Sequence, residues 1–197
     1  LQIGNPALLA ELTQIKVVAD FRSRDIAACG QGAPLVPAFH KAIFRHADIN
    51  RAIINIGGIA NITYLASSGE TFGFDSGPGN MLMDEWIYRH LNLEYDADGG
   101  WASTGTVVEP LLARMLADPY FSLQPPKSTG RDLFNHVWLN KLLNNTQHKP
   151  NDVARTLLAL TAHSIHRSLI EYCGALDEVY LCGGGAKNGL LKQSLQT

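Results

Sequence analysis

The sequence predicts an α/β fold in which helices flank a mixed β-sheet, and three observations support this prediction. Short runs rich in β-branched and aromatic residues alternate with turn residues in the middle of the chain, as in strands joined by tight turns. Apolar residues recur at helical spacing on both sides of these runs. A last apolar run follows the longest helical pattern. Three antiparallel strands that continue into helices and a parallel strand are the pattern of a ribonuclease H-like unit.

The first 49 residues are predicted to contain two helices and one strand. A helix is expected over 6–13, where Pro6 suits the first turn and leucines share one side. The β-branched run 15–19 is predicted to be a buried strand. After a stretch of Gly, Pro and small residues, a second helix is expected over 35–45.

The rest of the chain is predicted to begin with three consecutive strands. A Gly-Gly pair after the first strand and a Ser-Ser-Gly turn after the second are hairpin signals. Residues 95–150 are less regular, and the best helix pattern follows them, with Asn151 as its cap and Gly174 as its stop. The predicted strands are 51–56, 59–66, 70–74 and 178–182, and the predicted helices are 81–91, 109–116 and 151–173, with one more helix after 185.

Composition and charge argue against several classes of protein. The 197 residues are 46% hydrophobic and 17% charged, which is ordinary for a globular cytosolic protein. A net charge of -2 provides no basic field for a nucleic-acid backbone. No apolar run is long enough to cross a bilayer, and no signal peptide is visible. Three scattered cysteines suit a reducing compartment. We therefore expect a cytoplasmic protein with neither nucleic acid nor membrane as a partner.

Three glycine-bearing bends are candidate ligand-binding loops. At the first bend, Gly57-Gly58, backbone N–H groups could approach phosphate oxygens, although a plain hairpin turn is the favoured alternative for this pair alone. The second bend, 77–79, follows a strand expected to end at Asp75 and precedes a helix, where anions are favoured. A carboxylate at a strand tip is typical of a catalytic group, and a turn-capping aspartate is the alternative.

The third bend is Gly183-Gly184-Gly185, between a buried strand and a helix. Such a bend suits a flat ligand, for example an adenine ring that lies against the backbone. Its spacing is neither that of a P-loop nor that of a dinucleotide fingerprint. Each bend alone is a weak signal. Because all three belong to one predicted sheet, we expect them to open onto one shared crevice.

Several strings, in the same order, resemble the anhydro-N-acetylmuramic acid kinases over essentially the whole chain. These strings lie at 18–22 (VADFR), 30–40 (GQGAPLVPAFH), 55–61, 77–84 (GPGNMLMD), 127–131 (KSTGR), 134–135 and 182–188. The chain is thus similar to a family of the actin, hexokinase and Hsp70 superfamily, and the resemblance implies an actin-like ATPase fold. Cys29 departs from the pattern, since the family usually has a glycine there.

The resemblance implies a reaction. Enzymes of this family use water to open the 1,6-anhydro bridge of anhydro-N-acetylmuramic acid and phosphorylate O6 from ATP, giving N-acetylmuramic acid 6-phosphate in cell-wall recycling. It further implies that Asp75 is the base that activates water, that ATP and Mg²⁺ are used, and that the protein is a homodimer. A different sugar kinase of the same superfamily and a non-catalytic nucleotide-binding module are the alternatives.

The resemblance also assigns binding residues. It places the sugar beside Asp20, Arg22 and Asp25. The guanidinium of Arg22 suits the substrate's carboxylate, and Asp20 is a second candidate base. The alternative for this cluster is a structural ion pair. Residues 127–131 are expected to line the cleft, or else to begin a helix capped by Ser128 or Thr129. The substrate-binding set is completed by Gly77 and Asn80, and the nucleotide-binding set is Asn55, Gly57, Gly58, Asn61, Gly183, Gly184, Gly185 and Asn188. No metal site built from protein side chains is predicted.

The predicted domain organisation has two parts. Residues 1–49 are expected to be the C-terminal part of a first lobe. Residues 50–197 are expected to be a second, ribonuclease H-like lobe with an insertion at about 95–150 and a truncated C-terminus. The family's N-terminal phosphate loop has no counterpart in the sequence. We therefore expect an incomplete two-lobed kinase that is inactive by itself.

Overall fold

Four strands form one mixed sheet in the computed structural model, which describes residues 4–143 and 146–196. The order is β3-β2-β1-β4, with β2 antiparallel to both β1 and β3, and β4 parallel to β1. The strands are β1 (Arg51–Ile56), β2 (Ile59–Leu65), β3 (Thr71–Pro78) and β4 (Glu178–Cys182). The four strands predicted for this sheet are confirmed, and β3 continues beyond its predicted end.

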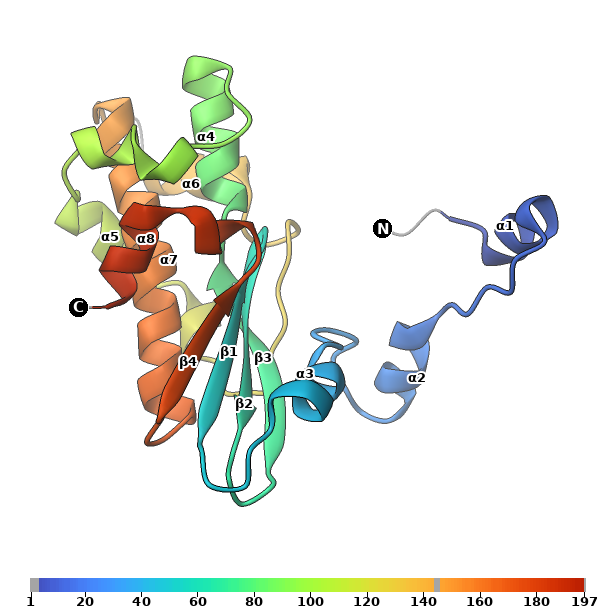
Figure 1. Ribbon diagram of the computed structural model, residues 1–197. Coiled ribbons are helices and arrows are strands. Elements are labelled where there is room, and N and C mark those ends of the chain that lie inside the picture. The colour runs from blue at the N-terminus through green and yellow to red at the C-terminus, as the bar shows by residue number, and fades with distance from the viewer. Residues whose placement is uncertain (1–3, 144–145, 197) are drawn as a thin grey trace.

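The helices that follow the first three strands gather on one side of the sheet (Figure 1). They are α4 (Met81–Leu91), α5 (Glu109–Leu116), α6 (His136–Leu143), α7 (Pro150–Tyr172) and α8 (Gly189–Leu195). Short 3₁₀ turns are η1 (Ala97–Gly99), η2 (Ala102–Thr104), η3 (Pro119–Ser122) and η4 (Gly184–Lys187). Ile54, Ile62 and Phe74 of the sheet share one buried cluster with Leu157 and Leu160 of α7. Alternate residues of each strand therefore face the core.

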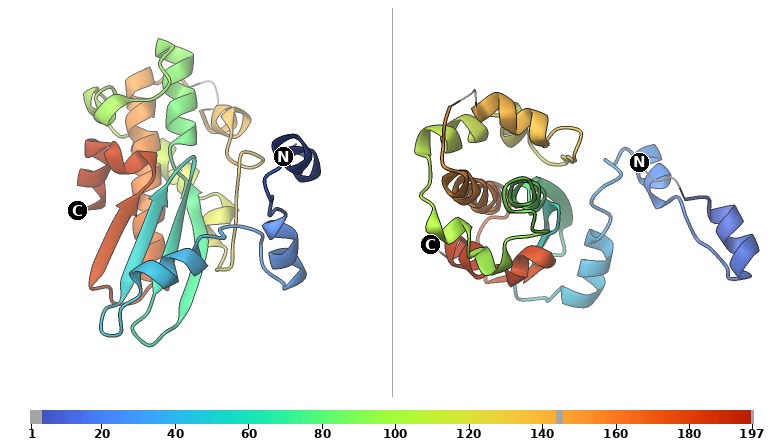
Figure 2. Two further views of the ribbon diagram at one scale, coloured as in Figure 1. Left: turned by 45° about the vertical axis from the view of Figure 1, so that its right-hand side comes forward. Right: turned by 90° about the horizontal axis from the view of Figure 1, so that it is seen from above.

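Helix α3 (Pro37–Phe44) packs on the opposite face of the sheet (Figures 1 and 2). His40 Nδ1 lies 2.9 Å from Thr63 Oγ1 of β2. Gly73 of β3 lies under the helix, since a Cβ added there would be only 2.5 Å from Pro37 Cγ. A glycine on this face thus allows the helix to approach the strand closely.

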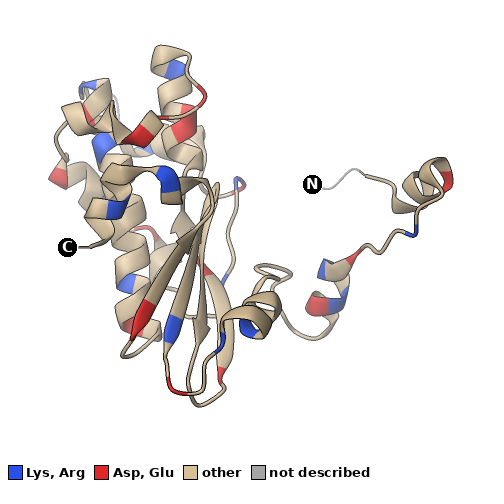
Figure 3. Ribbon diagram, viewed as in Figure 1, with Lys and Arg blue, Asp and Glu red and all other residues tan. Residues whose placement is uncertain are grey.

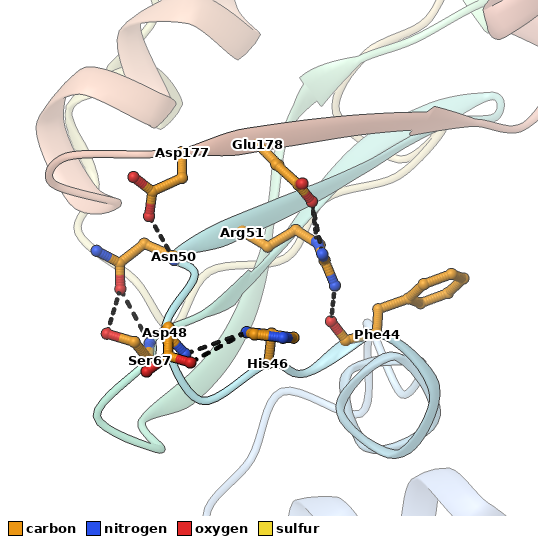
Figure 4. A network of polar contacts seen from close by, with 8 residues as sticks. All are labelled: Phe44, His46, Asp48, Asn50, Arg51, Ser67, Asp177 and Glu178. Atoms are coloured by element: carbon orange, nitrogen blue, oxygen red, sulfur yellow. Dashed lines mark hydrogen bonds and ion pairs between the residues drawn. The ribbon is translucent and has the colours of Figure 1, made fainter.

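A polar network joins α3 and β4 to the start of β1 (Figure 4). Arg51 Nε and Nη2 lie 2.7 Å and 2.5 Å from Glu178 Oε2, and Arg51 Nη1 donates to the Phe44 carbonyl. The amide of Asn50 donates to Asp177 Oδ2 at 2.8 Å. Residues far apart in the sequence are therefore held at the same end of the sheet.

The N-terminal segment differs most from its prediction. Helices α1 (Pro6–Thr13) and α2 (Phe21–Ala27) lie away from the sheet (Figure 2). The strand predicted at 15–19 is wrong: this stretch is coil, and Val18 is 70% exposed. No strand of the described chain lies alongside to pair with it, and a β-branched run alone does not satisfy its backbone. Helix α2 was not predicted, because the residues that follow it in the sequence are rich in glycine.

Two other helices also differ from the prediction. Helix α7 begins at Pro150 with Lys149 as its cap, and the Asn151 side chain instead donates to the Thr104 carbonyl at 2.9 Å. Proline at the first position favours this start. Helix α6 was not predicted within the irregular region. The predicted domain division into 1–49 and 50–197 stays a prediction, and residues 1–3, 144–145 and 197 lie outside the described residues.

Charge is distributed evenly over the described chain. Figure 3 shows Lys and Arg residues scattered among Asp and Glu residues on most elements. Within the described ranges, no helix combines the length and the apolar character that crossing a membrane requires.

Candidate active site

A row of polar residues crosses the sheet on the side of α3. Asn55 of β1 lies opposite Asn61 of β2, Asn61 lies opposite Asp75 of β3, and Cys182 of β4 is the parallel partner of Asn55. Directly opposed residues project from the same face of a sheet. Asp75 therefore lies inside β3, and the prediction that it ends the strand is wrong, because Gly77 still pairs with β2.

Asp75 is buried and held from several directions. The residue is 5% exposed, and its Oδ2 accepts hydrogen bonds from Ser128 Oγ at 2.9 Å and from the Thr129 amide at 3.0 Å. The Tyr120 hydroxyl donates to the Asp75 carbonyl at 2.6 Å. Burial raises the pKa of Asp75, and the bonds from Thr129 and Ser128 and the charge of Arg22 oppose this rise. The result is a fixed carboxylate that is more basic than an exposed one.

Two buried polar atoms without a partner flank this carboxylate. Asn61 Oδ1 and Thr129 Oγ1 have no hydrogen-bond partner among the described residues. Asn61 is the cross-strand partner of Asp75, and Thr129 donates to it through its amide. Buried polar atoms are normally hydrogen-bonded, so this position fits a water molecule or a ligand hydroxyl.

The segment 127–131 lies along β3 and does not begin a helix. The Asp75 amide donates to the Lys127 carbonyl at 3.1 Å. The alternative of a helix capped by Ser128 or Thr129 is wrong, because α6 begins later and Asn135 Oδ1 accepts from the backbone at its start. The other expectation, that this segment lines the cleft, stays a prediction, and the structure shows that Ser128 and Thr129 contact Asp75.

The first two glycine bends contact each other. The Gly57 carbonyl accepts from the Asn80 amide at 2.8 Å, and the Gly58 carbonyl accepts from the Gly79 amide at 2.9 Å. A Cβ added at Gly79 would be 2.3 Å from the Gly57 oxygen. The contact thus requires glycine at position 79. In contrast, Gly77 faces the core, since a Cβ added there would be 2.8 Å from the Phe121 ring.

The third bend packs against the end of β1. A Cβ added at Gly183 would lie 2.6 Å from Asn55 Oδ1, and one added at Gly185 would lie 2.4 Å from Ile56 Cγ2. Asn80 Nδ2 donates to the Ile56 carbonyl at 3.2 Å and so connects the second bend to the same place. The structure therefore brings the three bends together at one end of the sheet.

A cavity of about 480 Å³ opens beside the third bend. Its lining includes Asn80, Asp84, Gly184, Gly185 and Asn188. Burial raises the pKa of Asp84 to about 6, and the charge of Arg131 partly opposes the rise. The size is within the usual range for small-molecule sites. Asn80, which we expected among the sugar-binding residues, lies at this cavity.

A larger cavity, of about 950 Å³, lies between the N-terminal segment and α3, and Asp20 and Asp25 contribute to its lining. Arg22 Nη1 donates to the Gly32 carbonyl at 2.7 Å, while Asp25 Oδ2 accepts from the Gly32 amide at 2.7 Å. These two side chains therefore shape the loop around Gly32. Cys29, in place of the family's glycine, has a φ of 67°, a left-handed conformation that favours glycine.

Comparison with known proteins identifies the family. The family described as "Anhydro-N-acetylmuramic acid kinase" matches residues 1–197. Relatives of that name from Nitrosomonas europaea and Nitrosospira multiformis are 58% and 54% identical over 196 residues. These alignments cover 100% of this chain but 54% and 53% of the relatives, so the chain spans about half their length.

One solved structure is also similar, the activator of the 2-hydroxyisocaproyl-CoA dehydratase from Clostridium difficile with bound ADPNP. It is 14% identical with a TM-score of 0.48, and the match covers 82% of this chain and 55% of that one. Similarity at this level transfers no ligand or activity. The family match over the whole length is decisive, and with it the predicted actin-like fold class is confirmed. The chain belongs to the anhydro-N-acetylmuramic acid kinase family.

Proposed function

We propose that the full-length protein is an ATP-dependent kinase that opens the 1,6-anhydro bond of anhydro-N-acetylmuramic acid and phosphorylates O6. One observation carries the proposal: Asp75 is a fixed, buried carboxylate with two unsatisfied polar atoms, Asn61 Oδ1 and Thr129 Oγ1, beside it. Family membership supplies the class of substrate.

Asp75 is the proposed general base. Because Oδ2 already accepts two hydrogen bonds, Oδ1 is the oxygen that would accept a proton from water. The water oxygen bonds to the anomeric carbon, the bond between that carbon and O6 breaks, and the proton goes to Asp75. The freed O6 then attacks the γ-phosphorus of ATP, and ADP leaves. The product is N-acetylmuramic acid 6-phosphate. Asn61 Oδ1 and Thr129 Oγ1 are the proposed groups that orient the water.

The three glycine bends are the proposed nucleotide-binding elements. Their close packing keeps side chains away from the end of β1, and the cavity beside Gly184 and Gly185 has room for a base and ribose. In the part of the chain that the structure describes, no three His, Cys, Asp or Glu side chains form a metal cluster. In this half of the protein, contacts with Mg²⁺ would therefore run mainly through phosphate and water oxygens. When bound, it neutralises charge on the transferred phosphoryl group.

We also propose a cytoplasmic homodimer that acts in cell-wall recycling. The composition supports the location, and the family resemblance supports the assembly and the role. Arg22 is the proposed partner of the substrate's carboxylate, since a guanidinium suits a carboxylate. Asp20, on the wall of the larger cavity, is the second candidate base.

The test uses the full-length protein with the anhydro sugar, ATP and water labelled with a heavy oxygen isotope. We expect ADP release with label at the anomeric hydroxyl. The variant Asp75→Asn should lose at least about 100-fold in turnover while nucleotide binding is unchanged. Asp48→Asn, at a side chain that is 87% exposed, is the control and should be fully active.

Three outcomes would contradict the proposal. Normal turnover by Asp75→Asn would exclude this residue as the base, and Asp20→Asn would then be tested in the same way. Phosphorylation of other sugars but not of the anhydro sugar would indicate a different sugar kinase of the superfamily. Binding of ATP without consumption in the presence of any amino sugar would indicate a non-catalytic nucleotide-binding module.

A further inference from the structure

Lys127 is a buried lysine that the proposed reaction does not use. The residue is 5% exposed, and no ion pair to it is present within the described ranges. Its Nζ lies 4.9 Å from the centre of the Tyr120 ring and 5.7 Å from that of Tyr172. Burial of an ammonium group is costly, and aromatic faces offset part of that cost. A charge retained in such a place calls for a physical explanation.

The backbone around Lys127 is attached to Asp75. The Lys127 carbonyl accepts from the Asp75 amide at 3.1 Å, and the next two residues, Ser128 and Thr129, donate to Asp75 Oδ2 at 2.9 Å and 3.0 Å. Tyr120, whose ring faces the Lys127 ammonium, also donates its hydroxyl to the Asp75 carbonyl at 2.6 Å. Lys127 and Tyr120 thus contact each other and support the same aspartate from two directions.

We propose that Lys127 is a positioning residue for Asp75. Its ammonium group, between the rings of Tyr120 and Tyr172, fixes the segment 127–129 so that the Ser128 hydroxyl and the Thr129 amide point at Oδ2. The catalytic consequence rests on the proposed function, whereas the fixing of the segment 127–129 by Lys127 does not.

The charges around the two groups are few. Burial lowers the pKa of Lys127, Glu171 opposes this and Arg167 adds to it; the latter two, both on α7, pair with each other at 3.2 Å. Arg22 is the charge that acts on Asp75, and the Tyr120 hydroxyl stays protonated because burial and Asp75 raise its pKa. Removal of the Lys127 charge would therefore act on Asp75 mainly through the position of the donors on Oδ2.

The decisive variant is Lys127→Met in the full-length protein. Methionine has a similar length and an apolar body, so it would preserve packing and stability if Lys127 only filled space. We expect hydrogen exchange in the peptide 127–131 to accelerate about tenfold, because the contacts of the ammonium group with both aromatic rings are lost. Turnover should fall by about tenfold or more, with the KM for ATP changed less than about twofold. The acid limb of kcat/KM should move to higher pH, because the bonds that lower the pKa of Asp75 are weakened.

Matched variants keep the inference falsifiable. Lys141→Met, at an exposed lysine on α6, should change none of these quantities. If Lys127→Met fails to fold, the pair Tyr172→Leu and Tyr172→Phe replaces it, since only leucine removes the aromatic face. We then expect rapid exchange with leucine and slow exchange with phenylalanine.

Two results separate the positioning role of Lys127 from the proposed reaction. Unchanged exchange and an unchanged pH profile in Lys127→Met, or equal exchange in the two Tyr172 variants, would overturn the positioning role. If the wild-type protein phosphorylates no sugar, the proposed function fails, while the exchange measurement still decides whether Lys127 holds the segment.

Discussion

Replacing Asp84 by asparagine is expected to stabilise the folded protein at neutral pH. Asp84 lies in the first turn of α4 and lines the cavity beside the third bend. Burial raises its pKa to about 6 from an ordinary 3.8, and Arg131 opposes the rise. The ionised carboxylate is thus in an environment that favours its neutral form.

The sign and size of the effect follow from this shift. A carboxyl group whose folded pKa is raised binds its proton more tightly in the folded state than in the unfolded chain. Its ionisation therefore destabilises the fold, fully above the folded pKa and not at all below the unfolded one. A shift of about two units gives at most about 3 kcal/mol at about pH 7.5 and about 1 kcal/mol at about pH 4.5. The helix N-terminus favours the carboxylate by about 0.5 kcal/mol, which does not reverse the sign.

The assay is urea unfolding of the full-length protein at these two pH values. Asp84→Asn should raise the free energy of unfolding more at the higher pH. Glu85→Gln is the matched control, because it makes the same change of charge on the same helix at a side chain that is 45% exposed. Its ion pair with His136 is on the surface, so the control should lose little. The reasoning would be refuted if Asp84→Asn left the free energy of unfolding unchanged, or raised it equally at both pH values.

The remaining predictions concern the bends and the network at the start of β1. Gly79→Ala places a methyl group against the Gly57 oxygen, 2.3 Å away, so we expect about 1–3 kcal/mol of destabilisation by urea unfolding and weaker ATP binding by calorimetry. Gly4→Ala, whose added Cβ has nothing within 4 Å, separates crowding from a general effect of alanine. Arg51→Met removes the bonds to Glu178 and to the Phe44 carbonyl, so hydrogen exchange in α3 and β4 should accelerate. Unchanged exchange there would show that the network does not hold these elements.

Elements governed by local sequence were predicted well. The bounds of β1, α4, α5 and β4 equal the predicted ranges, because each has its own apolar period and its own turn residues. The end of β3 was not predictable, since Gly77 and Pro78 resemble a loop and only pairing with β2 keeps them in the strand. The strand predicted at 15–19 was wrong for the opposite reason: its β propensity was local, and no strand among the described residues pairs with it.

The bends at 57–58, 77–79 and 183–185 were expected to open onto one crevice. The structure brings them together at one end of the sheet, whereas Gly77 faces the core, and the binding roles of these glycines stay predictions. The partners of Asp75 come from 53 and 54 residues further along the chain, and no periodicity reports such a contact. Lys127 and Tyr120 were missed as supporting residues. The only signal for Lys127 was its place at the start of the KSTGR string.

The parallel pairing of β1 with β4 has a consequence for the order of folding. Arg51 and Glu178 are 127 positions apart, whereas β1, β2 and β3 follow one another directly. Short-range hairpins form sooner than contacts that close a long loop. As the polypeptide leaves the ribosome, the first two bends can meet early, and the third joins them only after the long crossover has docked. The proposed nucleotide site is thus complete only when the last strand is in place.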